Sequence, residues 1–74
     1  MSSELSNQVE VTINGERRQV EGGQTVAQLL EILEIPPGRV AIELDRDILK
    51  KDLWDDTRLR GGEELEIVHF VGGG

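Results

Sequence analysis

The chain has 74 residues with one Trp, one Phe and no Tyr, which limits it to a single domain with one modest core. It has no cysteine and one histidine, so a disulfide framework or a cysteine–histidine metal site is poorly supported. Fifteen acidic and eight basic side chains give a formal charge of −7, which disfavours a nucleic-acid partner and fits either a protein partner with a basic surface or a role in solubility.

The first residues carry no targeting signal. Residues 1–7 are polar apart from Leu5, and we interpret them as a disordered N-terminal extension. They lack the basic and apolar regions of a secretory signal, and no later apolar run approaches a membrane-spanning length. We therefore expect a cytoplasmic protein without a membrane partner.

A β-hairpin is predicted next. Val9, Val11 and Ile13 alternate with polar residues, which is typical of a half-buried strand. Asn14-Gly15 is a strong signal for a two-residue hairpin turn. Residues 16–20 are expected to form the return strand.

A single helix follows the hairpin. Thr25 and Gln28 have the spacing of a capping box, in which each side chain binds a backbone amide at the start of a helix. Apolar side chains then recur at helical spacing on one face, while Gln28 and Glu31 face water. The apolar stripe consists of Val26, Leu29, Leu30 and Leu33. Residues 36–38, Pro-Pro-Gly, are expected to end the helix.

The remainder of the chain predicts further strands. Residues 40–44 alternate as a third strand that turns near residues 45–46 into the apolar pair Ile48-Leu49. Residues 51–57 indicate a turn or short helix, and residues 65–71 are the most strand-like stretch present. The order predicts an α+β domain over residues 8–71, with one helix packed across one face of a mixed four- to five-stranded sheet. Residues 72–74 then form a flexible tail.

Little in this chain can catalyse a reaction. Catalysis requires a nucleophile beside a base or converging titratable groups, and the serines are confined to residues 2–6. The acidic residues between positions 45 and 56 are interpreted as solvated surface and not as a metal site. Alternation places His69 with the core-facing residues, so we expect it to be partly buried and hydrogen-bonded. Trp54 is interpreted as a cap on the core. We therefore predict that the chain is not an enzyme.

The C-terminal glycines are the main candidate site. Gly72 and Gly73 form a tail without Cβ atoms, narrow enough to enter another protein's channel and to present the carboxylate of Gly74 there. A carboxylate becomes an electrophile once it carries a leaving group such as AMP, and a sulfur or amine nucleophile can then attack it. The alternative is a linker or a disordered end.

The order of these elements resembles the ubiquitin-like β-grasp family over residues 9–74. Three segments are similar, more narrowly, to the sulfur carrier proteins of thiamine thiazole biosynthesis. They are Gly23-Gln24-Thr25-Val26, Val40-Ala41-Ile42-Glu43-Leu44, and the stretch from Glu64 to Gly74 that contains Val-His-Phe-Val-Gly. Gly61-Gly62-Glu63 departs from the Gly-Asp expected before the last strand, which alters a turn and leaves the tail unchanged.

The resemblance implies a carrier that binds no cofactor of its own. A ubiquitin-activating-like adenylyltransferase would use ATP to adenylate Gly74. A sulfur donor such as a cysteine desulfurase would supply the sulfur of a thiocarboxylate, and thiazole synthase would receive that sulfur. The absence of cysteine agrees, because sulfur held on the terminal carboxyl needs no thiol, whereas a persulfide carrier requires one.

The last strand also supplies a predicted docking surface. Alternation places Glu64, Glu66, Val68 and Phe70 on its outer face. Val68 and Phe70 would form an apolar anchor beside the tail, and the two acids would steer a basic partner surface. Two alternatives share the double-glycine ending: a carrier that resembles the molybdopterin-synthase small subunit, and a ubiquitin-like modifier attached to lysines.

Overall fold

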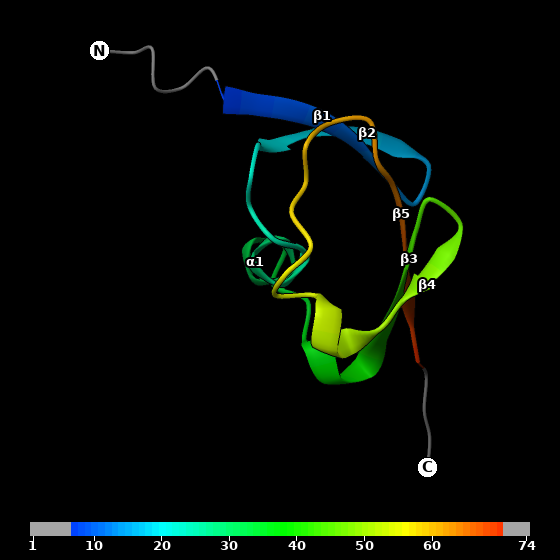
Figure 1. Ribbon diagram of the computed structural model, residues 1–74. Helices are drawn as coiled ribbons and strands as arrows, with labels where there is room; N and C mark the ends of the chain where they lie inside the picture. The colour runs from blue at the N-terminus through cyan, green and yellow to red at the C-terminus, as the bar shows by residue number, and fades with distance from the viewer. Residues whose placement is uncertain (1–6, 71–74) are drawn as a thin grey trace.

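The computed structural model describes residues 7–70 of the chain. Within this range a mixed sheet of five strands curves around one helix, as Figure 1 shows. The helix is α1 (Val26–Ile32), and short 3₁₀ turns occupy Pro37–Arg39 and Lys51–Leu53. The strands are β1 (Gln8–Ile13), β2 (Glu16–Glu21), β3 (Val40–Leu44), β4 (Asp47–Leu49) and β5 (Glu64–His69). The predicted α+β fold of the β-grasp type is confirmed.

The last strand occupies the centre of the sheet. The strand order is β2-β1-β5-β3-β4, so β5 lies between the two hairpins. It is parallel to β1 and antiparallel to β3. The pairing with β3 covers Leu65 to His69, whereas the pairing with β1 covers only Glu64 and Leu65. The strand that leads to the C-terminal glycines is therefore anchored mainly by β3.

Both hairpins turn through residues with positive φ. Asn14 and Gly15 have φ of 52° and 84°, and Asp45 and Arg46 have φ of 50° and 75°. Two successive residues of this kind form the turn whose twist matches the flanking strands, and Asn-Gly adopts it at low cost. The predicted first hairpin is confirmed, and its return strand continues to Glu21.

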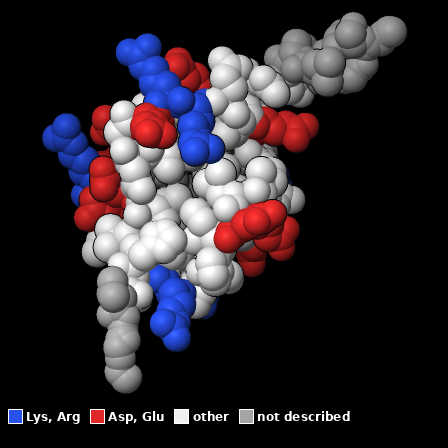
Figure 2. Space-filling model, turned by 180° about the vertical axis from the view of Figure 1, so that it is seen from behind, with Lys and Arg blue, Asp and Glu red and all other residues white. Residues whose placement is uncertain are grey.

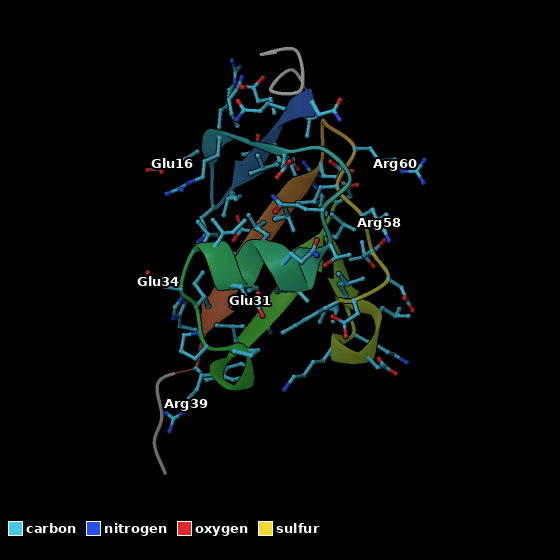
Figure 3. All side chains as sticks on the ribbon, turned by 90° about the vertical axis from the view of Figure 1, so that its left-hand side faces the viewer. Glu16, Glu31, Glu34, Arg39, Arg58 and Arg60 are labelled. Atoms are coloured by element: carbon cyan, nitrogen blue, oxygen red, sulfur yellow. The ribbon has the colours of Figure 1, made fainter. Side chains whose placement is uncertain are left out.

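The predicted start of α1 is confirmed in detail. The Gln28 amide donates to Thr25 Oγ1 (3.1 Å), and the Thr25 amide donates to Gln28 Oε1 (2.9 Å), which completes the capping box. Val26, Leu29 and Leu30 are buried against the sheet. Gln28 and Glu31 are exposed, and Figure 3 shows Glu31 on the helix.

The predicted end of α1 is wrong by several residues. The helix ends at Ile32, before the prolines, and Glu34 adopts a left-handed conformation with φ of 60°. The Ile35 amide then donates to the Leu30 carbonyl (2.9 Å) and the Glu34 amide to the Glu31 carbonyl (3.1 Å). This pair of hydrogen bonds is a Schellman motif, which satisfies the last helical carbonyls without a proline. Pro36 instead precedes the following 3₁₀ turn, which begins at Pro37.

The core lies between α1 and the inner face of the sheet. Trp54 closes one end of it with 4% of its surface exposed, and its Nε1 donates to the Leu49 carbonyl (3.0 Å), so its predicted structural role is confirmed. The other buried apolar residues are Val11, Ile13, Val20, Val26, Leu29, Leu30, Val40, Ile42, Leu59, Leu65 and Ile67.

The prediction that His69 is partly buried is wrong. His69 does follow Leu65 and Ile67 on the same face of β5, but it is exposed. Alternation fixes the face on which a strand residue lies, and it does not fix how far the core extends along the strand. His69 is the last residue of β5, and it lines a surface groove together with Leu33 and Ile35 instead of joining the core.

Three backbone amides form hydrogen bonds that order the start of β1 and the turn before β5. The Asn7 carbonyl accepts a hydrogen bond from the Gly22 amide (2.7 Å), which joins the start of β1 to the residue after β2. The Glu63 carboxylate accepts hydrogen bonds from the amides of Arg60 and Gly61, both at 2.8 Å. These bonds order the Gly61-Gly62-Glu63 turn, which differs from the expected Gly-Asp.

No helix in residues 7–70 has the length and apolar character needed to cross a membrane.

Candidate docking surface and C-terminal site

The candidate reactive tail continues directly from the centre of the sheet. The Phe70 amide donates to the Arg39 carbonyl (2.9 Å), which extends the β3–β5 pairing by one residue beyond His69. Val71 and the three glycines, including Gly74, lie outside the described residues. The structure therefore fixes the root of the tail at Phe70, beside Arg39, which Figure 3 labels at that end of the molecule.

The four residues predicted for docking are all exposed. Glu64, Glu66 and Val68 alternate with buried residues along β5, and Val68 has 48% of its surface accessible. Phe70 follows in the same alternation with 57% accessible. Large apolar side chains this exposed beside a strand end are candidates for a protein interface. Their role in docking remains a prediction.

The sheet register adds residues to this surface that the sequence did not reveal. Ala41 lies opposite Val68 and Glu43 lies opposite Glu66 across the β3–β5 pair. Ile48 in turn lies opposite Glu43 across the β3–β4 pair, with 72% of its surface accessible. We call the whole set the outer patch. Its members are Ala41, Glu43, Ile48, Glu64, Glu66, Val68 and Phe70.

The outer patch is acidic at one end and apolar at the other. Glu43, Glu64 and Glu66, together with Arg46, line a shallow depression of about 360 Å³. Glu43 and Glu66 are direct cross-strand neighbours, and like charges in such positions repel each other. A cationic group from a partner would relieve that repulsion. Within residues 7–70 no three His, Asp or Glu side chains are placed to share a metal ion.

The C-terminal glycines fall within a match to a known family. A model of the ThiS family matches residues 11–74, which include the outer patch and Gly74. The chain belongs to the ThiS family. This membership confirms the resemblance drawn from Val40–Leu44 and from the segment after Glu64.

Individual proteins and structures agree with the ThiS assignment. The chain is 34% identical over 50 residues to the sulfur carrier protein ThiS of Bacillus subtilis, which covers 68% of this chain and 76% of that protein. The crystal structure of the thiamine biosynthesis protein ThiS from Geobacter metallireducens superposes with a TM-score of 0.78 at 29% identity, covering 89% of this chain and all of that one.

A third relative is much longer. The chain is 36% identical over 66 residues to a protein from Paramagnetospirillum magneticum named thiazole synthase. The similarity covers 89% of this chain but 20% of that protein, so the chain spans about a fifth of its length. One polypeptide in that organism therefore contains a ThiS-like segment within a protein named for thiazole synthesis.

Proposed function

We propose that this chain is a sulfur carrier of thiamine biosynthesis that holds sulfur on the carboxyl group of Gly74. The observation that carries the proposal is the ThiS family match, which runs through the last residue of the chain. The exposed outer patch beside the tail gives a partner enzyme a surface on which to dock. The chain acts as a co-substrate of partner enzymes in the cytoplasm.

The chemistry begins with activation of the terminal carboxylate. A carboxylate oxygen of Gly74 attacks the α-phosphorus of ATP in an adenylyltransferase of the ubiquitin-activating type, and pyrophosphate leaves. Sulfur then attacks the acyl carbon, AMP leaves with the carboxylate oxygen, and a thiocarboxylate remains. ATP is consumed in the partner's active site, and the carrier itself binds no cofactor.

The absence of cysteine in the carrier limits which thiol can release the sulfur donor. A cysteine desulfurase presents sulfur as a persulfide, and attack by its terminal sulfur leaves an acyl disulfide on Gly74. A thiol must then cleave that disulfide to release the thiocarboxylate. Because the chain has no cysteine, the thiol has to come from a partner or from a small-molecule reductant.

Thiazole synthase is the proposed acceptor of the sulfur. The protein named thiazole synthase in Paramagnetospirillum magneticum includes a segment similar to 66 residues of this chain. Joining a carrier to its acceptor in one polypeptide raises their effective concentration, which is useful when the two act in sequence. In the present chain the outer patch would supply the contact, with Val68 and Phe70 as the apolar anchor.

The proposal is tested by carrier-dependent exchange of pyrophosphate into ATP, catalysed by the adenylyltransferase. We expect exchange with the full chain, and its loss when Gly74 is deleted or when one alanine is appended after it. Both variants leave residues 7–70 unchanged, so circular dichroism should show the same fold. Equal exchange with all three proteins would contradict the role of Gly74.

A further inference from the structure

The first residue of each hairpin turn reaches across to β5. Asp45, in the β3–β4 turn, donates its backbone amide to the Glu64 carbonyl (2.8 Å), and its Oδ1 accepts from the Glu64 amide (3.0 Å). Asn14, in the β1–β2 turn, donates its backbone amide to the Leu65 carbonyl (2.9 Å). Its side chain accepts from the Ile67 amide at Oδ1 (2.7 Å) and donates to the Ile67 carbonyl from Nδ2 (3.3 Å). Asp45 thus holds the start of β5, and Asn14 holds the strand nearer its end.

The Asn14 side chain continues the β1–β5 pairing after β1 has ended. β1 ends at Ile13, and the chain turns back through Gly15. A side-chain amide carries an acceptor and donors, as a peptide group does, and here it offers one of each to Ile67. The β1 side of β5 is therefore held two residues nearer the tail than the strand pairing at Leu65 reaches.

The turn alone does not require asparagine at position 14. Its φ of 52° suits glycine as well as asparagine, and glycine adopts it without strain. The two side-chain hydrogen bonds to Ile67 are a separate feature, because they are partly buried and join residues 53 positions apart. Asparagine therefore adds a contact with β5 that the turn itself does not need.

The stretch that follows this contact carries the proposed apolar anchor. Val68 and Phe70 come directly after Ile67 in the alternation of the outer face, with 48% and 57% of their surfaces accessible. Their amides face β3, and that of Phe70 donates to the Arg39 carbonyl (2.9 Å). Within residues 7–70, removal of the Asn14 side chain would leave this end of β5 hydrogen-bonded on the β3 side alone.

Charged side chains give this end of β5 no comparable support. Within residues 7–70 the only ion pair joins Arg17 to Glu10 at 3.9 Å, and both residues lie in the first hairpin. Figure 2 looks onto the side of the molecule that carries the turn of this hairpin, and it shows uncharged surface between the charged side chains. Polar support for the end of β5 therefore comes from hydrogen bonds, with β3 on one side and Asn14 on the other.

We propose that Asn14 is a positioning residue for the carrier: by holding Ile67, it fixes Val68 and Phe70 in the orientation in which a partner enzyme binds them. The inference rests on the proposed function, because it concerns the same docking surface and the same tail. A partner that binds a loosened strand end has to order it, and this ordering costs affinity. Asn14 acts through Ile67 and not on the carboxyl group of Gly74, so its removal should weaken binding and leave the chemical step unchanged.

Steady-state pyrophosphate exchange with the adenylyltransferase tests the proposal. Asn14→Gly should raise the KM for the carrier about fivefold, with kcat within about twofold of that of the unmodified chain. Val26→Ala is the matched control, because Val26 is fully buried in α1 and its truncation destabilises the domain by leaving a cavity. At a temperature at which circular dichroism shows both variants folded, Val26→Ala should leave KM within about twofold of the unmodified value.

Amide hydrogen exchange of the ¹⁵N-labelled carrier measures the same contact without a partner. In Asn14→Gly the Ile67 amide should exchange about tenfold faster relative to the Val68 amide, which faces β3. Comparison of the two amides separates a local loosening of β5 from a general loss of stability. Val26→Ala should therefore leave the ratio of the two rates unchanged.

The outcomes separate this inference from the proposed function. An unchanged ratio of amide exchange rates in Asn14→Gly, or equal KM values for Asn14→Gly and Val26→Ala, would overturn positioning while pyrophosphate exchange with the unmodified chain still supported the proposed function. A lower kcat at unchanged KM would also overturn it, because Asn14 would then affect the chemical step. Absence of pyrophosphate exchange with the unmodified chain would overturn both.

Discussion

Replacement of Asn14 by glycine tests how the root of the tail is held. Glycine accepts the φ of 52° found at Asn14, so Asn14→Gly removes the side chain without straining the turn. The loss of a 2.7 Å and a 3.3 Å hydrogen bond to Ile67 should cost about 1.5 kcal/mol, and the greater freedom of glycine in the unfolded chain about 0.5 kcal/mol more. The expected destabilisation is therefore about 2 kcal/mol.

Thermal and urea unfolding followed by circular dichroism would measure this effect. For a domain of this size a loss of 2 kcal/mol should lower Tm by roughly 8–16 °C. Arg46→Gly is the matched control, because Arg46 has φ of 75° and its side chain makes no hydrogen bond within residues 7–70. Its Tm should fall much less than that of Asn14→Gly, because it carries the same cost of glycine freedom without the loss of two hydrogen bonds. A change of less than about 0.5 kcal/mol for Asn14→Gly would refute the role of the Asn14 side chain.

Three further predictions concern the core and the outer patch. Leu29→Ala should lower the free energy of unfolding by about 3 kcal/mol in urea titrations, whereas Ile48→Ala should change it by less than about 0.5 kcal/mol; equal losses would contradict the assigned burial. Glu66→Gln should raise the free energy of unfolding by about 0.3 kcal/mol at low salt, because it removes the repulsion from Glu43. The same substitution should slow association with a basic partner in stopped-flow measurements, and an unchanged association rate would argue against electrostatic steering. Phe70→Ala should raise KM for carrier-dependent adenylation about tenfold with stability intact, and unchanged kinetics would remove Phe70 from the docking surface.

Local signals account for the parts of the fold that could be predicted from the sequence. The Asn14-Gly15 turn and the Thr25–Gln28 capping box depend on residues close together in the chain, and both form as expected. The end of α1 could not be predicted in this way. Glu34 adopts the left-handed conformation that glycine usually adopts after a helix, so no glycine marks the end of α1 in the sequence. The prolines therefore gave the predicted end of the helix, although the helix ends before them.

Some residues of the candidate site could not be predicted from the sequence, because they join it as neighbours across strands. Alternation placed Glu66 and Val68 on the outer face of β5, but the positions of Glu43 and Ile48 beside them depend on the register of three strands. The hydrogen bonds between Asn14 and Ile67 join residues 53 positions apart, and no local pattern indicates them. His69 was misplaced because alternation fixes the face of β5 on which it lies but not how far the core extends along that face.

Intact mass spectrometry tests the proposed sulfur chemistry most directly. The carrier would be incubated with the adenylyltransferase, ATP, a cysteine desulfurase with cysteine, and a thiol reductant. The account predicts a mass increase equal to the replacement of one oxygen by sulfur, located by fragmentation at Gly74, and no increase when one alanine is appended after Gly74. An unchanged mass while pyrophosphate is released, or a sulfur located at any other residue, would contradict it.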